Sequence, residues 1–541
     1  IQTVALNLTR HEFYALFFQD DWKLTPRITL NLGLRYEYES PIRDPQRRLS
    51  RYLDLTQPIA EFQGAGAPSL PAQVMAIRGS APRWNGAWVF TDDANPGAWD
   101  APHLFLPRVG LAYRINDRTA FRVGYARYAV PPSIEGDGNV ALLGSTPYPG
   151  FEATTNTLGP LQGIPRTRLS DPYPATGPNA NPLVPAVGKS LGAYTGLGDS
   201  LSWFRQDWRV GMNERINVSL QRQIWNRFVV DATWFMNFGY NQANYLEGNE
   251  SLLNLMDPRF AFTHKAAVDA RVPNPFLGLL PRTKMPGPLR TLSTLTVREL
   301  LTPYPHYRVL HESPAGNISS RYQAFQLQVQ RPFANGFNML LGYNYNRSRE
   351  QMYFDDQDRF DGILSWFDGF KPRQRLTLAS IYEFPFGRGR KWGANWHPAL
   401  DGILGGWSVS GIFQRSSGWL LRFSGVDLVT GDPRIPNPTR ARWFDTSVFQ
   451  LQPAYTRRTN PHQWPGLTGP RYQNLDLTVQ KMFRITEKVS WEFRMEAYNL
   501  TNSFMGANPS TSRTSAVFGQ VVNQLTTHRG REFQYSGRFY W

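Results

Sequence analysis

Charged side chains lie on the polar side of several segments in which apolar and polar residues alternate. An unpaired charge in a dry protein core is costly, so a face that carries such a series must meet water or polar partners. Groups of this kind could attract an anionic solute, dock an acidic plug surface or pair with one another along a wall, and we favour wall pairing. The residues with this pattern are Arg35, Glu37, Arg108, Arg114, Arg122, Glu492, Arg494 and Glu496.

An acidic segment supplies the main candidate for metal binding. Asp355, Asp356 and Asp358 offer carboxylate oxygens of the kind that calcium prefers. Their spacing does not match the ligand pattern of an EF-hand loop, and Arg359 adds a counter-charge within the segment. A solvated loop is therefore the simpler interpretation of these residues.

Catalytic chemistry has little support in the sequence. The chain contains no cysteine, which excludes thiol nucleophiles and thiolate metal sites. The segments 387–389 and 416–418 lack the strand-to-helix context of a phosphate loop or a nucleophile elbow. His306 and His311 share one long connection, but the eight histidines show no metal-ligand spacing. We therefore expect neither an enzyme nor a bound cofactor.

The charged series belong to segments that alternate between apolar and polar residues, the pattern of half-buried β-strands. In 28–38, for example, Ile, Leu and Tyr occupy one face, while Arg35 and Glu37 lie on the other. The pattern predicts about thirteen antiparallel strands, including 375–384, 406–414 and 531–541, many long enough for a tilted membrane crossing. Tight turns are expected at Thr25-Pro26-Arg27, Asn116-Asp117-Arg118, Trp225-Asn226-Arg227, Asn335-Gly336 and Thr486-Glu487.

Very long connections alternate with these tight turns. They cover roughly 40–103, 130–210, 241–317, 349–372, 416–470 and 503–529, lengths that are uncommon inside a compact soluble domain. Outer-membrane β-barrels combine short periplasmic turns with long extracellular loops. Aromatic residues in the long connections could stack on sugars or peptides, or hold the loops together. They are Trp84, Trp88, Trp99, Tyr173, Trp203 and Trp208.

Two patterns favour a transmembrane barrel over a large soluble β-protein such as a propeller or a multi-sandwich adhesin. The apolar faces become aromatic toward the strand ends, as interfacial girdles do, while the opposite faces carry full charges. The chain also ends on aromatic residues at alternate positions, which would form the C-terminal signal of a barrel. These terminal residues are Phe533, Tyr535, Phe539 and Trp541.

Composition excludes two other classes of protein. No run of about 18 apolar residues is present, so helical membrane spans are not expected. The net charge is +16, but Arg and Lys are scattered along the chain instead of forming a stripe, which argues against nucleic-acid binding.

Local motifs along nearly the whole chain resemble one family of barrels. Residues 14–24 (YALFFQDDWKL) and 32–37 (LGLRYE) resemble the barrel of TonB-dependent receptors. Further stretches resemble the Oar-like branch of that family: 219–222 (SLQR), 274–276 (NPF), 303–305 (PYP), 383–389 (EFPFGRG), 405–411 (GGWSVSG), 474–476 (NLD), 494–502 (RMEAYNLTN) and 518–519 (FG).

The resemblance implies an outer-membrane receptor of a Gram-negative bacterium that imports a large or scarce solute through a plugged barrel, powered by the TonB complex. The expected partners are outer-membrane lipid, the TonB complex, the barrel assembly machinery through the C-terminal strand, and an unidentified extracellular ligand. Two alternatives remain open. One is an adhesive or structural barrel that binds a partner without transport, and the other is an open diffusion porin.

The strand directions predict that the chain is part of a larger barrel. If the short turns are periplasmic, the segment 13–24 runs inward from the extracellular side, whereas an exported barrel begins in the periplasm. Bacterial single-chain barrels also have an even number of strands. We therefore expect residues 1–541 to be the C-terminal part of one barrel domain of about 22 strands, preceded by a signal peptide, a plug and further strands.

Overall fold

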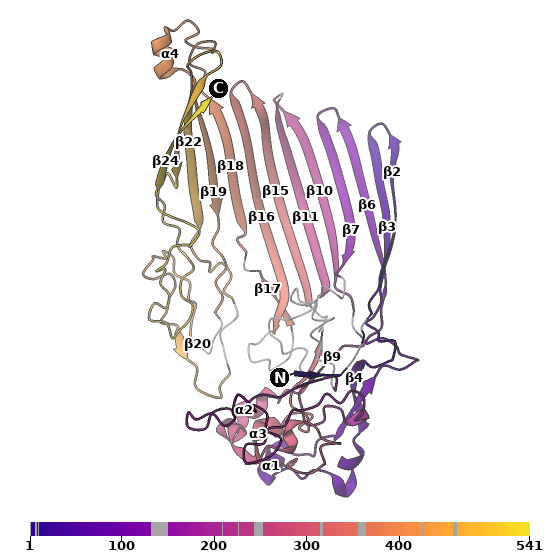
Figure 1. The fold of residues 1–541 in the computed structure, drawn as a ribbon. Coiled ribbons are helices and arrows are strands. Elements are labelled where there is room, and N and C mark those ends of the chain that lie inside the picture. The colour runs from indigo at the N-terminus through magenta and orange to yellow at the C-terminus, as the bar shows by residue number, and fades with distance from the viewer. Residues whose placement is uncertain are drawn as a thin grey trace.

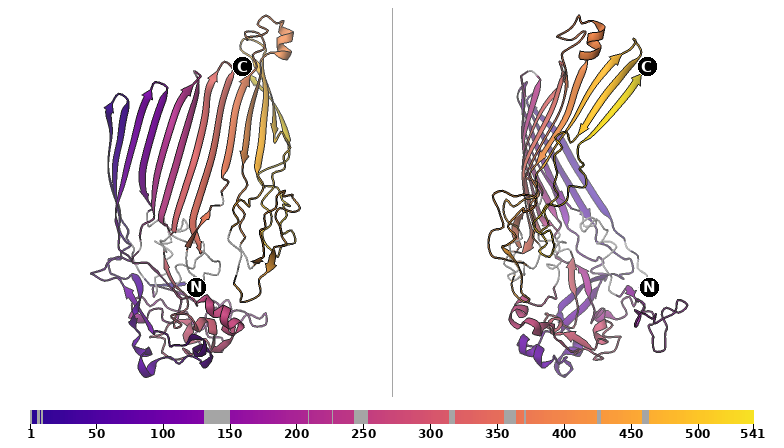
Figure 2. Two further views of the ribbon diagram at one scale, coloured as in Figure 1. Left: turned by 180° about the vertical axis from the view of Figure 1, so that it is seen from behind. Right: turned by 90° about the vertical axis from the view of Figure 1, so that its left-hand side faces the viewer.

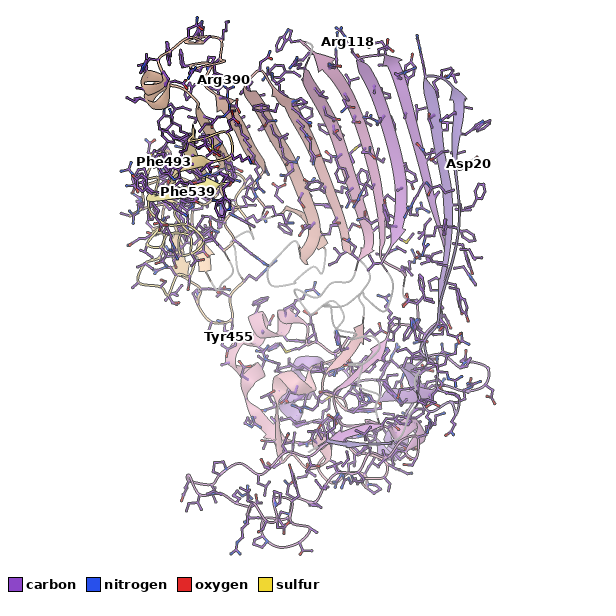
Figure 3. The ribbon with its side chains drawn as sticks, turned by 45° about the horizontal axis from the view of Figure 1, so that its top comes forward. Asp20, Arg118, Arg390, Tyr455, Phe493 and Phe539 are labelled. Carbon is purple, nitrogen blue, oxygen red and sulfur yellow. The ribbon has the colours of Figure 1, made fainter. Side chains whose placement is uncertain are left out.

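The computed structural model describes residues 2–5, 8, 10–130, 150–207, 209–225, 227–242, 253–313, 318–354, 364–369, 371–423, 427–457 and 463–541. Its helices are short, and none in these ranges is long and apolar enough to span a membrane. Strands dominate the chain. They form one large curved sheet, with a layer of folded loops at one end (Figure 1, Figure 2).

The large sheet is antiparallel, and in the described residues it has 14 strands. Strands follow one another in sequence order from β2 to β24, so each strand pairs with its neighbours along the chain; β17 (Leu364–Asp368) lies beside β16, off this path. The path consists of β2 (Phe13–Thr25), β3 (Ile28–Glu39), β6 (His103–Asn116), β7 (Thr119–Ala129), β10 (Met212–Ile224), β11 (Phe228–Gln242), β15 (Ile318–Ala334), β16 (Phe337–Phe354), β18 (Gln374–Glu383), β19 (Trp407–Ser416), β22 (Tyr472–Arg484), β23 (Ser490–Tyr498) and β24 (Glu532–Tyr540).

The five expected hairpins are all present at the end of the sheet away from the loops. At the turn between β15 and β16, Asn335 has φ of 52° and Gly336 has φ of 74°, the left-handed backbone that two-residue hairpin turns require. The sequence prediction of about thirteen consecutive strands joined by tight turns is therefore confirmed. The predicted strands 28–38, 375–384, 406–414 and 531–541 agree within two residues, whereas β16 continues to Phe354, into the connection predicted at 349–372.

The sheet has two chemically distinct faces. On β16, Leu341, Tyr343 and Tyr345 lie on one face, and their partners on β15 are also apolar. Gly342 and Asn344 lie on the other. We call these the apolar face and the polar face. Large side chains of the apolar face are exposed, among them Leu32, Leu34, Phe105, Val109 and Trp234. An exposed apolar surface that continues across many strands is what lipid contact requires.

Three long connections fold into a unit that we call the loop domain, formed by residues 40–102, 150–207, 209–211 and 253–313. Its strand pairs are β4 (Ser50–Pro58) with β5 (Asn85–Phe90), β12 (Arg271–Pro273) with β13 (Thr294–Thr296), and the parallel pair β9 (Leu201–Phe204) and β14 (Leu310–Ser313). Its helices are α1 (Ala72–Arg78), α2 (Pro258–His264) and α3 (Val297–Leu300), with 3-10 turns at Ala60–Phe62, Gly64–Gly66, Gly192–Tyr194, Lys265–Asp269 and Pro288–Arg290.

The loop domain has its own hydrophobic core. Phe62, Phe276, Met285 and Leu300 are fully buried, although they come from two connections that are far apart in sequence. Polar contacts also cross between the connections: Arg78 donates hydrogen bonds to the carbonyl oxygens of two residues near α3, Leu300 and Thr302, at 3.2 and 2.7 Å. The loops therefore stabilise one another and do not hang separately from the strands.

The remaining elements lie outside this core. β1 (Gln2–Val4) pairs with β8 (Glu152–Thr154), and β20 (Asp427–Val429) pairs with β21 (Phe449–Leu451). A second loop cluster forms around Phe423, Phe444 and Trp464. At the hairpin end, α4 (Pro398–Leu404) projects from the connection between β18 and β19 (Figure 1).

Candidate functional site: the polar face and the loop domain

The eight charged residues that were predicted to face water or polar partners all lie on the polar face, as the strand registers show. The structure does not gather them into one site. It distributes them over two regions, one on β3, β6 and β7 and the other on β23 near the opposite edge of the sheet.

The β23 group is a compact ion network. The Arg494 guanidinium lies 3.0 Å from a carboxylate oxygen of Glu492 and 3.6 Å from one of Glu496. Tyr540 of β24 donates a hydrogen bond to the second oxygen of Glu492 at 3.0 Å. Glu492 is only 8% exposed, so these partners satisfy a carboxylate that would otherwise be buried alone.

The β3–β7 group is only partly paired. Arg35 contacts Glu37 at 2.5 Å on the same strand. Arg122 donates to the side-chain oxygen of Gln221 at 3.2 Å, and Arg114 donates to a backbone carbonyl oxygen. Among the described residues, Arg108, Arg114 and Arg122 have no carboxylate partner, so this part of the polar face keeps a positive charge.

A row of arginines and aromatic rings that the local sequence patterns do not reveal crosses the same face. Arg108 and Arg215 lie 5.2 and 5.3 Å from the ring centre of Tyr128. Arg215 also lies 5.4 Å from the ring of Phe235, which contacts Tyr322 at 5.9 Å. The alternation of side chains along each strand predicts that all of them lie on this face. Only the register between β6, β7, β10, β11 and β15 brings them into contact.

A shallow hollow lies next to this row, on the polar face of β11, β15, β16 and β18. Its volume is about 400 Å³, and both apolar and hydrogen-bonding side chains line it. They include Asp231, Thr233, Gln326, Gln328, Asn344, Arg375 and Thr377. Such a surface can offer both hydrogen bonds and apolar contacts to a solute.

The loop aromatics hold the loops together, which was one of the two roles considered for them. Trp84, Trp88, Trp99 and Trp203 are each less than 8% exposed. Trp88 and Trp203 meet edge to face, and Trp203 donates a hydrogen bond to Glu312 at 3.0 Å. Tyr173 is partly exposed, and Trp208 lies outside the described residues. The four buried rings are not available to stack on a ligand.

His306 is part of this packing. Its imidazole is fully buried and lies edge to face against Phe62 and Trp84, while Nε2 lies 2.9 Å from the carbonyl oxygen of Asn85. Burial lowers the pKa of His306 to about 4, because a charged imidazole has no solvation there. His311 is on the adjacent strand β14, where burial also lowers its pKa.

A second polar contact ties the loops together at the surface. Glu61 accepts hydrogen bonds from Lys284 at 2.5 Å and from Tyr194 at 2.6 Å. Burial raises the pKa of the Glu61 carboxyl, but these two hydrogen bonds outweigh it and hold the pKa below its usual value. The three residues come from three different connections, so the contact stabilises the assembled loop domain.

The calcium candidates Asp355, Asp356 and Asp358 lie outside the described residues. Within the described ranges, no group of three or more His, Asp or Glu side chains is arranged to hold a metal ion.

The expected C-terminal signal forms an exposed aromatic stripe on β24. Phe533, Tyr535 and Phe539 are 50%, 65% and 59% exposed, and Trp541 follows directly after the strand. Phe539 packs beside Trp491 of β23 on the same face. Glu492 and Arg494 lie on the opposite face of β23, so the two faces differ here as they do elsewhere in the sheet.

A long meander of tilted antiparallel strands, apolar on one face and charged on the other, defines the β-barrel class of membrane proteins. A family model described as an outer membrane beta barrel domain matches residues 2–534, so the chain belongs to this family. The protein is an outer-membrane β-barrel, and the family is one of membrane barrels and not of enzymes. A comparison with curated proteins gives no match.

Solved structures similar to the chain include outer-membrane receptors. The ferric-catecholate import receptor Fiu from Escherichia coli K12 is 12% identical, with a TM-score of 0.41, and the match covers 98% of this chain and 45% of that one. The ferripyoverdine receptor of Pseudomonas aeruginosa is 11% identical, with a TM-score of 0.39, and the match covers 98% and 39%. The ferric yersiniabactin receptor FyuA of Yersinia pestis is 10% identical, with a TM-score of 0.38, and the match covers 98% and 46%. The chain spans less than half the length of each.

Proposed function

We propose that the protein is the barrel of an outer-membrane receptor that takes up a large or scarce solute with energy from the TonB complex. The observation that carries this proposal is the asymmetry of the sheet, which has tight hairpins at one end and an interlocked loop domain with a buried core at the other. A preformed loop domain loses little conformational freedom when it binds a ligand, which favours capture of dilute solutes.

In this proposal the polar face lines the lumen of a larger barrel, and residues 1–541 are its C-terminal part. Arg108, Arg114 and Arg122 would then present positive charge to the lumen, where they could meet an acidic plug surface. The paired groups Arg35–Glu37 and Glu492–Arg494–Glu496 would form a charged wall that water solvates at little cost. A barrel of about 22 strands is wide enough to need a plug, in contrast to an 8-stranded barrel that side chains fill.

Accumulation assays on whole cells test the proposal. A strain that lacks the gene and a complemented strain would each receive a panel of labelled ferric siderophores, oligosaccharides and peptides, with and without a protonophore. We expect gene-dependent accumulation of one class of compound that the protonophore abolishes. Gene-dependent accumulation that resists the protonophore would indicate a porin, and surface binding without accumulation would indicate an adhesin. Either result would overturn the proposal.

A further inference from the structure

The apolar face changes its chemistry where the strands approach the loops. Along this face of β16, Leu341, Tyr343 and Tyr345 are followed by Arg347 and Arg349. The neighbouring strand β15 repeats the change, because Phe325 pairs with Tyr345 and Arg321 pairs with Arg349. Charged groups therefore follow the aromatic residues at the same level on both strands, on the face that we assign to lipid.

Four arginines gather around Trp366 and Asp368 of β17, two at each residue. We call them the outer arginine patch: Arg321, Arg347, Arg349 and Arg373. The guanidinium carbons of Arg321 and Arg349 lie 4.4 and 5.8 Å from the ring centre of Trp366 on β17. Stacking on an indole fixes the direction of a guanidinium and leaves its N–H groups free to donate to another partner.

The patch has more positive than negative charge. Asp368 is its carboxylate, and it already contacts Arg347 at 3.3 Å and Arg373 at 2.5 Å. Arg321 and Arg349 have no carboxylate partner among the described residues. Both Arg347 and Arg373 keep substantial exposure, 55% and 43% of their side-chain surface. Counted over the described residues, the patch therefore carries a net positive charge that can attract an anionic group.

The height of the patch matches the headgroup layer. Val329 pairs with Leu341, in the middle of the apolar stretch of β16. From Val329 to Arg321, strand β15 rises about 26 Å at ~3.3 Å per residue. With a strand tilt near 40°, this is about 20 Å along the membrane normal. That is about 8 Å beyond the edge of an apolar band about 25 Å tall, within the headgroup layer of a bilayer about 40–45 Å thick in total. Arginines just above the interfacial aromatic residues would meet lipid headgroups and not acyl chains.

We propose that the outer arginine patch binds the phosphorylated headgroup of an outer-leaflet glycolipid. Arginine forks form paired hydrogen bonds with phosphate oxygens, and these charge-assisted bonds are about twice as strong as neutral ones. Arg321, Arg347 and Arg349 lie on the apolar face, opposite to the face that we assign to the lumen, so the inference does not depend on transport.

Native mass spectrometry of the detergent-purified full-length protein tests the proposal. The protein would be titrated with bisphosphorylated lipid A and with enzymatically dephosphorylated lipid A. The patch variant Arg321→Gln/Arg349→Gln removes the two arginines that lack a carboxylate. The matched control Arg108→Gln/Arg122→Gln removes the same charge from the polar face. Heat-modifiable migration in gels confirms that each variant is folded.

We expect lipid A binding to fall at least fivefold in the patch variant and to stay within twofold of wild type in the control. Dephosphorylated lipid A should bind as weakly to wild type as lipid A binds to the patch variant. Equal binding by the patch variant and the control, or equal binding of both lipids, would overturn the proposal. So would full displacement of lipid A by equimolar inorganic phosphate, which would indicate a general anion site.

Discussion

His306 places its Nε2 2.9 Å from the carbonyl oxygen of Asn85, in a fully buried environment of aromatic rings. The two residues come from different connections, so this hydrogen bond joins two parts of the loop domain. Burial among these rings favours the neutral form of the imidazole over the protonated form.

The loop domain should therefore lose stability in acid. The pKa of His306 is about 4 in the folded loops and about 6.5 when they unfold, so the unfolded state binds the extra proton between these values. The contribution is present above pH 6.5 and is lost as the pH falls toward 4, by up to about 3 kcal/mol. Urea midpoints measured between pH 7 and 4 should show this slope, and His306→Gln should flatten it. The exposed His397→Gln is the control, and an equal slope in both variants would contradict the assignment.

Adjacent positions on β16 should respond in opposite ways to the same substitution. Leu341→Arg places a charge on the apolar face, where it should cost about 2–4 kcal/mol at mid-membrane depth and reduce the folded fraction in the outer membrane. Gly342→Arg places the charge on the polar face, where an added Cβ meets no atom within 4 Å, and should be tolerated. Membrane fractionation with heat-modifiability measures both. Equal tolerance of the two variants would mean that the faces are assigned wrongly.

A cavity in its core should unfold the loop domain while the strands of the large sheet stay folded. Phe62 is fully buried among aromatic rings, and Phe62→Ala should cost about 3–5 kcal/mol by leaving a cavity. Limited proteolysis should then cleave the loop domain faster while the strands stay protected. Leu169→Ala removes a fully exposed side chain and is the matched control. If both variants were cleaved at the wild-type rate, the loops would not depend on this core.

The hairpin between β15 and β16 should be sensitive to a single methyl group. Gly336 has φ of 74°, and a Cβ there would lie 3.0 Å from the carbonyl oxygen of Glu383. Gly336→Ala should therefore cost about 1–2 kcal/mol. Thermal unfolding followed by heat-modifiability measures it, with Gly402→Ala in α4 as the control, since no atom lies within 4 Å of its added Cβ. An unchanged midpoint in Gly336→Ala would show that the turn relaxes.

The aromatic stripe of β24 should support assembly. Phe539→Ser/Trp541→Ser removes two exposed rings and should lower the amount of folded protein in the outer membrane several-fold, if the barrel assembly machinery recognises this strand. Gln534→Ser, on the opposite face of the strand, is the control. Equal membrane levels in both variants would exclude a role for the stripe in assembly.

The strands could be predicted from sequence because their signals are local. Alternation and a pair such as Asn335-Gly336 act within a few residues, and the thirteen consecutive strands follow from them. Face assignment followed too, since parity along a strand fixes which side chains lie together. The partners across strands could not be predicted, because they depend on register: nothing in the sequence near Arg215 indicates that Tyr128 and Phe235 lie on either side of it.

The loop domain escaped prediction for a related reason. Its core joins residues as distant as Phe62 and Phe276, and its helices span at most seven residues, too few to show a helical period. The aromatic residues of the loops were recognised, but their burial could not be inferred. The local sequence does not indicate how three connections of about 60 residues or more fold onto one another.

One contact at the hairpin end bears on the closure of the barrel. Lys481 of β22 donates to the carbonyl oxygens of Gly405 and Asp401, at 2.5 and 3.1 Å, where α4 ends before β19 begins. The same ammonium lies 5.3 Å from the ring centre of Trp407 on β19. A slip of one residue between the two strands would turn Lys481 to the other side and break every one of these contacts. The stagger of neighbouring strands sets the circumference of a closed cylinder. A single lysine thus helps to fix the width of the barrel.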